Sequence, residues 1–222
     1  MTLAKRAAAE ALGTALLLAA VVGSGIMGER LAGGNAAIAL LANSLATGFA
    51  LIALIVAFGP RSGAHFNPVV TIALALRGDI ERRSVVPYVA AQFFGAIVGV
   101  IVAHVMFDLA PLQTPQKFRT GIGQWTGELV ATFGLVYLVL SLSRKNDWAA
   151  PFAVGGYIAA AYWFTSSTSF ANPAVTLARG FTDTFAGIGL GNVPAFVGFQ
   201  ILGAALAVGM DAWFRAPVSR QP

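Results

Sequence analysis

The chain has 222 residues, of which 57% are hydrophobic and only 10% are charged, and its mean hydropathy is +0.76. Soluble domains usually carry about 25% charged residues, so this composition excludes a soluble enzyme or binding domain and indicates an integral membrane protein. The net charge of +5 comes from basic residues scattered between apolar stretches, which argues against nucleic-acid binding, and the absence of cysteine excludes disulfides.

The first half of the chain contains three apolar stretches that are long enough to cross a bilayer, because about 20 apolar residues cover its ~30 Å hydrocarbon core. We predict membrane spans at residues 7–27, 36–58 and 87–107. The apolar stretch 67–76 is too short at ~1.5 Å per helical residue. It opens with Asn67 and Pro68, and an Asn cap followed by Pro is a strong helix start. We therefore predict a half-helix that begins inside the bilayer, and its approach must be buried in protein or line a cavity.

The second half repeats this arrangement after a polar connector at residues 108–119, which is the natural midpoint of the chain. We predict membrane spans at residues 122–142, 149–164 and 192–213. The second half-helix covers 172–178 and opens with Asn172, Pro173 and Ala174.

Matched residues in the two halves indicate an internal repeat. Glu10 is matched by Glu128, and the stretch that starts at Gln92 is matched by the one that starts at Gln200. Glycines in these stretches and spans, such as Gly95, Gly99, Gly203 and Gly209, are expected to allow close helix packing. Three full spans separate the half-helices, and an odd number makes them enter from opposite faces.

The predicted fold is therefore all-α, with six transmembrane helices and two re-entrant half-helices in an inverted repeat. The repeat halves are about 7–110 and 120–214 of a single domain at 1–222. Ten lysines and arginines lie on the predicted face that holds both termini, against four on the other face. The excess of positive charge puts both termini in the cytoplasm of a multi-pass protein.

Two helix N-termini that meet near the bilayer midplane would concentrate positive potential there. Asn67 and Asn172 could cap their helices through oxygen and offer N–H donors to a passing solute. A neutral, hydrogen-bonding solute can cross such a point and a cation should not. One Asn-Pro pair alone would more often be a plain helix start, but two copies in inverted halves favour a pore.

Glu10 and Glu128 are carboxylates inside apolar spans, so each is either a proton relay or a brace that accepts hydrogen bonds from the re-entrant loops. Their matched places favour the brace. His65 is expected to order the loop before Asn67. We find no nucleophile–base pair, phosphate loop or metal-ligand cluster, so we expect no enzymatic activity, no cofactor and no metal.

The stretch from Ser62 to Thr71, together with the two Asn-Pro half-helices, resembles the aquaporin and aquaglyceroporin family, also called the major intrinsic proteins. The resemblance implies a passive channel for water or small neutral solutes, with four subunits and one pore in each. The family usually has Ala after the first Asn-Pro, where this chain has Val69. It usually has a filter Arg after the second Asn-Pro-Ala, where this chain has Val175.

By the same resemblance, the selectivity filter would consist of Thr47, Tyr162, Ser169 and Val175. Without the usual cation it should be wider or less polar than a strict water filter. Arg179, one turn beyond Val175, could restore positive charge, but we expect it to extend to the membrane interface instead.

The pattern is similar to aquaglyceroporin-like channels associated with bacterial arsenic-resistance operons. It predicts a channel for water, glycerol and uncharged metalloid acids or organoarsenicals in a bacterial inner membrane. The alternatives are a secondary transporter with inverted repeats, a water-selective channel, and a membrane scaffold with a vestigial pore.

Overall fold

The computed structural model describes residues 1–143 and 148–216. Its long helices are α1 (Leu3–Leu31), α2 (Ala36–Ser62), α4 (Val85–Met106), α5 (Ile122–Leu142), α6 (Ala150–Phe164) and α8 (Val193–Arg215). The half-helices are α3 (Pro68–Arg77) and α7 (Pro173–Ala178), and short 3-10 helices are η1 (Arg82–Ser84), η3 (Arg179–Phe181) and η4 (Leu190–Asn192). The all-α architecture predicted from the sequence is confirmed.

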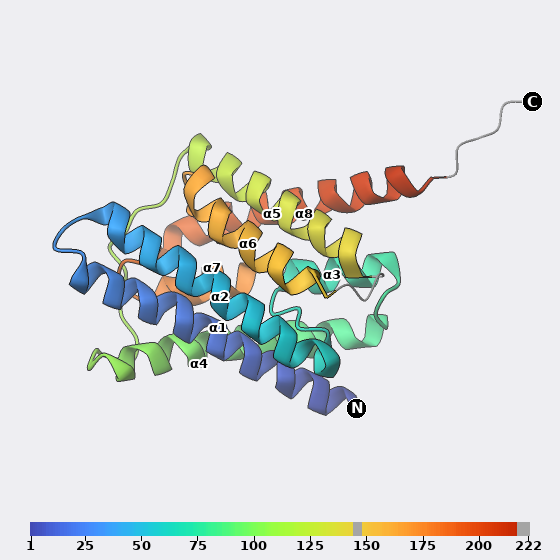
Figure 1. Ribbon diagram of the computed structural model, residues 1–222, viewed down its shortest axis with the longest axis horizontal. Coiled ribbons are helices and arrows are strands. Elements are labelled where there is room, and N and C mark those ends of the chain that lie inside the picture. The colour runs from blue at the N-terminus through green and yellow to red at the C-terminus, as the bar shows by residue number, and fades with distance from the viewer. Residues whose placement is uncertain (144–147, 217–222) are drawn as a thin grey trace, which may run out of the picture.

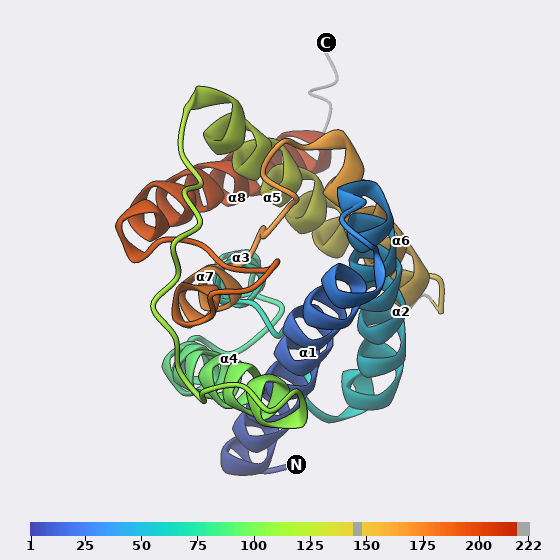
Figure 2. The ribbon, with the colours of Figure 1, turned by 90° about the vertical axis from the view of Figure 1, so that its left-hand side faces the viewer.

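The long helices surround the two half-helices, as the end-on view in Figure 2 shows. In Figure 1, α1 begins and α8 ends at the same end of the bundle, which we call the terminal end. The segment 107–121 and the turn between α1 and α2 lie at the opposite end, which we call the connector end. Helix α3 lies toward the terminal end and α7 toward the connector end, as expected for an inverted repeat.

Among the described residues, five helices are long and apolar enough to span a membrane. Helix α6 occupies the place of a sixth span but has only 15 residues, about 22 Å at ~1.5 Å per residue. The predicted ends of α5 are correct, whereas α1, α2 and α8 extend beyond the predicted spans. Helix α1 starts earlier because the Thr2 hydroxyl accepts a hydrogen bond from Lys5 N, and polar residues continue the helix past the apolar core.

Helix α2 continues through Pro60 and ends at Gly63, whose left-handed φ of 92° suits a glycine. The approach to α3 begins directly after this glycine. Helix α3 ends at Gly78, again left-handed with φ 84°. Each half-helix therefore begins with an Asn-Pro pair, and α3 also ends at a C-cap glycine.

Close contacts between helices depend on glycine, and such glycine contacts occur in both halves of the chain. A Cβ at Gly95 or Gly99 of α4 would collide with the backbone of α1, and one at Gly203 of α8 would collide with the backbone of α5. The prediction is wrong for Gly209, because among the described residues no atom outside its own stretch of helix lies within 4 Å of a Cβ built there. The contact of Gly48 with Gly155, between α2 and α6, was not predicted.

Several polar side chains are buried and many large apolar ones are exposed, unlike in a soluble protein. Glu10, Gln92, Glu128 and Gln200 are fully buried, whereas Phe94 is 68% exposed. Other exposed side chains of this kind include Leu16, Ile38, Phe49, Val86 and Ile201. This distribution suits an outer surface in lipid and a polar interior, and the protein is an integral, multi-pass membrane protein.

Candidate functional site

A cavity of about 180 Å³ passes between the two half-helices. It extends from Leu142 and Ser143, at the terminal end of α5, past Asn67 and Asn172 to Arg179. Most of its wall is aliphatic, with side chains such as Leu17, Leu51, Ile55, Leu135, Val154 and Ile158. A largely apolar wall leaves the few polar groups along the cavity to determine what it can hold.

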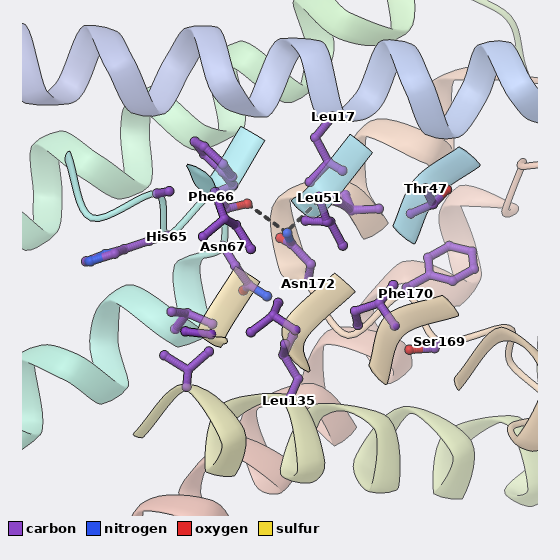
Figure 3. Close-up of a pocket in the computed structure, with 18 of the residues that line it drawn as sticks. Leu17, Thr47, Leu51, His65, Phe66, Asn67, Leu135, Ser169, Phe170 and Asn172 are labelled. Atoms are coloured by element: carbon purple, nitrogen blue, oxygen red, sulfur yellow. Dashed lines mark hydrogen bonds between the residues drawn. The ribbon is translucent and has the colours of Figure 1, made fainter. Parts of the chain in front are cut away.

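The two Asn-Pro helix starts meet in the middle of this cavity, as Figure 3 shows. Asn67 Oδ1 accepts a hydrogen bond from Val69 N at 3.1 Å, and Asn172 Oδ1 accepts from Ala174 N at 3.0 Å. Each side chain therefore caps its own half-helix through oxygen, with Pro68 or Pro173 in the first turn.

The amide nitrogens of the two asparagines cross to the opposite half. Asn67 Nδ2 donates to the carbonyl of Ala171, and Asn172 Nδ2 donates to the carbonyl of Phe66, each at 2.8 Å. This reciprocal pair, which the sequence did not reveal, fixes the two helix N-termini against each other. An amide nitrogen carries two hydrogens, so each asparagine keeps one for another acceptor.

The approach loops adopt matching, unusual backbone conformations. Ala64 and Phe66 before α3, and Ser169 and Ala171 before α7, have positive φ values between 48° and 51°. Non-glycine residues seldom adopt this region, and such conformations persist where surrounding contacts impose them. Here those contacts come from two buried carboxylates.

Glu10 holds the first loop. Its Oε1 accepts from Ser62 Oγ at 2.6 Å and His65 N at 3.0 Å, and its Oε2 accepts from Phe66 N at 2.7 Å and Gln92 Nε2 at 2.8 Å. Both carboxylate oxygens are therefore occupied by donors from the loop and from α4. The arrangement favours the brace over the proton relay.

Glu128 holds the second loop in the same way. It accepts from Phe170 N and Ala171 N, each at 2.9 Å, and from Gln200 Nε2 at 2.6 Å. Gln92 and Gln200 extend both networks to their half-helices, because they also donate to Thr71 Oγ1 and Thr176 Oγ1. The sequence presented these glutamines only as marks of the repeat, and their recurrence was the signal for this role.

His65 lines the cavity and lies in the loop that Glu10 holds. Its Nδ1 is 3.0 Å from Thr71 Oγ1, and its ring packs 5.3 Å from that of Tyr88, measured between centroids. The ring thus links the loop to the first turn of α3. Val69 does not reach the cavity; the neighbouring Val70 does.

The four predicted filter residues all line the connector half of the cavity. Thr47 Oγ1 and Tyr162 Oη, from α2 and α6, lie 3.3 Å apart within hydrogen-bond reach. Ser169 is 3% exposed, and its hydroxyl oxygen has no hydrogen-bond partner among the described residues. Val175 supplies an apolar wall.

The expectation that Arg179 extends to the membrane interface is wrong. Arg179 is 2% exposed and lines the cavity together with Val175, four positions earlier. Its Nε donates to the carbonyl of Ala186, and its guanidinium carbon lies 3.3 Å from the ring centroid of Phe170. The segment after η3 folds back over Arg179, so the side chain has no route to lipid.

Arg119, the last residue of the connector at 108–119, is also buried, and its guanidinium carbon lies 5.0 Å from the centroid of the same Phe170 ring. It donates to the carbonyls of Gly187, Ser167 and Phe185 and so ties the connector to the second approach loop. Burial lowers the pKa of Arg119 to about 10, which leaves it cationic at neutral pH.

Lys117 completes a positive cluster at the connector end. Burial, and then the charges of Arg119 and Arg179, lower the pKa of its ammonium group. The ammonium donates to the carbonyl of Phe185 at 2.9 Å and lies 4.8 Å from the centre of that ring. The connector end therefore holds three neighbouring cationic side chains, those of Lys117, Arg119 and Arg179, although Val175 carries no charge.

Comparisons with known proteins agree on the family of this chain. The family model described as "Major intrinsic protein" matches residues 1–169. The chain is 54% identical over 215 residues to "Aquaglyceroporin AqpS" of Rhizobium meliloti, covering 97% of this chain and 92% of that protein. It is 34% identical over 237 residues to "Aquaporin AqpM" of Methanothermobacter marburgensis, covering 93% and 96% of the two chains.

A solved structure supports the same fold. The aquaglyceroporin from Plasmodium falciparum superposes with a TM-score of 0.77 and covers 96% of this chain and 98% of its own. Because the two sequences are 20% identical, this likeness concerns the fold alone. The paired half-helices within a ring of long helices are therefore an arrangement known from an experimental structure.

Proposed function

The chain belongs to the major intrinsic protein family, and we propose that it forms a passive pore for water, glycerol and uncharged metalloid acids or organoarsenicals. The observation that carries the proposal is the continuous cavity that passes both asparagine-capped helix starts. The name of the relative from Rhizobium meliloti, an aquaglyceroporin, supports solutes larger than water. The arsenical cargo is an extension that follows from the sequence resemblance.

Cation exclusion in this pore would originate at the two helix N-termini. Each terminus carries a partial positive charge, and the capped ends of α3 and α7 meet where Asn67 and Asn172 bond across the cavity. A neutral oxygen gains a hydrogen bond from the remaining amide hydrogen, whereas a cation meets repulsion and loses its water. The mostly aliphatic wall offers a cation few replacement ligands.

The braces would keep this meeting point in place. Glu10 and Glu128 are each hydrogen-bonded through both oxygens to loop N–H groups and to a glutamine. Neither carboxylate is thus left to coordinate a coupling ion, which favours a pore over an ion-coupled secondary transporter. His65 would hold the first loop through Thr71.

Solute size would be set in the filter of Thr47, Tyr162, Ser169 and Val175, which all line the cavity. Tyr162 bonds to Thr47, so its ring is held against one wall. Val175 stands on another wall and is shorter than the Arg that the family usually has there. This combination would leave room for a bulky neutral solute. Assembly as a homotetramer, one pore per subunit, is part of the same proposal and follows from the family.

Val175→Arg is expected to reduce the flux of glycerol and arsenous acid several-fold more than the flux of water. The longer side chain would fill space that Val175 leaves open. Water is smaller than glycerol and arsenous acid, so its passage would be obstructed least. The measurement is stopped-flow permeability of proteoliposomes at matched protein density. Val175→Met, which adds length without charge or donors, separates the effect of size from that of the guanidinium. An unchanged ratio of bulky solute to water in Val175→Arg would contradict this assignment of the filter.

A further inference from the structure

We propose that Arg179 and Ser169 form a solute-binding subsite at the connector end of the cavity, in which Arg179 supplies the cation that Val175 cannot. The subsite would accept uncharged solutes that carry oxygen acceptors and hydroxyl groups, such as a polyol or a neutral oxyacid. It would also repel cations. The inference rests on the proposed function as a pore and identifies the residues that select the solute within it.

The position of Arg179 follows from helix geometry. Residues four apart lie on the same helix face, and Arg179 follows Val175 by one turn at the start of η3. Both residues line the cavity. Because the Val175 side chain is short, it leaves cavity space beside it unfilled. Arg179 reaches the same cavity from the next turn of the helix.

Two contacts fix the guanidinium there. Its Nε donates to the carbonyl of Ala186, and its flat face lies 3.3 Å from the centre of the Phe170 ring. Phe170 is in turn held by Glu128 through its backbone N–H. An arginine stacked on an aromatic ring keeps its outer N–H groups available, because only its face is used.

Arg179 and Ser169 each have one polar atom without a hydrogen-bond partner among the described residues. Arg179 Nη1 and Ser169 Oγ are both buried without a hydrogen bond among the described residues, and the two residues are 2% and 3% exposed. Within residues 1–143 and 148–216, no carboxylate forms an ion pair with Arg179. Both residues line the cavity, and buried polar groups of folded proteins are normally satisfied. The unpaired donor and hydroxyl therefore point to a ligand that enters the cavity.

Arg119 provides an internal comparison. It faces the same Phe170 ring, but its donors bind the carbonyls of Gly187, Ser167 and Phe185, and it does not line the cavity. Because these donors bind protein carbonyls, Arg119 stabilises the loops. Arg179 differs because it lines the cavity and its Nη1 has no hydrogen-bond partner among the described residues.

The test compares Arg179→Gln with Arg30→Gln in proteoliposomes. Arg30 is a matched control at the connector end, since it also donates to a carbonyl, that of Phe107 at 3.1 Å, and lies 5.2 Å from the Phe107 ring, but it does not line the cavity. Both variants remove one positive charge from the same end. Water flux, glycerol flux, arsenous acid uptake, and proton and potassium leak are measured at matched protein density.

Arg179→Gln is expected to raise cation leak relative to water flux at least about tenfold, because a fixed charge in a poorly hydrated passage is weakly screened. Arg30→Gln should leave every flux unchanged. Arg179→Lys should keep cation exclusion but lower the ratio of glycerol to water, because an ammonium lacks the fork of donors. Ser169→Ala should lower the same ratio without raising cation leak.

If Arg179→Gln matches Arg30→Gln in cation leak while both conduct water, the subsite is wrong and the proposed pore stands. If the unsubstituted protein conducts neither water nor glycerol above protein-free liposomes, the proposed function fails and the subsite fails with it. Should Arg179→Gln not fold, Arg179→Lys and Ser169→Ala decide the question. Unchanged ratios of glycerol to water in both would overturn the subsite.

Discussion

Replacing Glu128 with alanine is expected to lower the free energy of unfolding by more than about 3 kcal/mol and to abolish solute flux. The carboxylate accepts hydrogen bonds from Phe170 N, Ala171 N and Gln200 Nε2 in a fully buried position. Each buried donor left without an acceptor costs about 1–3 kcal/mol. The loop before Asn172 would then lose the contacts that hold Ala171 at its positive φ.

The measurement is thermal unfolding in detergent, followed by water flux in liposomes. Glu29→Ala is the control, because Glu29 is an exposed residue near the end of α1, where substitutions usually change stability little. Glu128→Gln separates the brace from a proton relay. A relay residue would lose activity on conversion to Gln with little loss of stability, whereas a brace would lose stability as well. A melting temperature for Glu128→Ala equal to that of Glu29→Ala would refute the brace.

Asn172→Asp is expected to raise cation leak relative to water flux at least about tenfold at neutral pH. The substitution keeps the shape of the side chain but replaces its donor with a negative charge at the meeting point of the two helix N-termini. At an effective dielectric constant near 20, two unit charges 4 Å apart interact by about 4 kcal/mol, enough to weaken the barrier to a cation.

Asn43→Asp is the matched control for this prediction. Asn43 is also buried and donates to a backbone carbonyl, that of Val21 at 2.8 Å, but it does not line the cavity. Both variants replace a buried amide donor with a carboxylate, so a general effect of a buried negative charge would appear in both. Cation leak should rise in Asn172→Asp alone. Equal leak in the two variants would mean that charge at Asn172 does not control ion exclusion.

Most of the fold could be predicted because two simple physical rules govern it. Lipid requires long apolar helices, and an Asn-Pro start within a short apolar stretch has few alternatives to a half-helix. The ends of helices were less predictable. Helix α2 continues past Pro60 to Gly63, for example, because the left-handed glycine determines its end and hydropathy does not.

The sequence alone did not show whether long polar side chains would lie in lipid, in the protein interior or in the cavity. Whether Arg179 reaches lipid or the cavity depends on how the segment containing Ala186 folds back over it, and hydropathy gives no information on that segment. The same holds for Arg119, whose carbonyl partners lie far away in the chain. The crossed bonds from Asn67 to Ala171 and from Asn172 to Phe66 likewise appear only once both loops are placed.

We propose above that the cavity between the half-helices is a passive route for neutral solutes. The most direct test is osmotic swelling of proteoliposomes that contain the unsubstituted protein, in glycerol gradients with and without opposing proton and potassium gradients. A passive pore should give swelling well above that of protein-free liposomes, at a rate that depends on the glycerol gradient and does not change with the ion gradients. Swelling that requires or follows an ion gradient, or none above the protein-free rate, would contradict it.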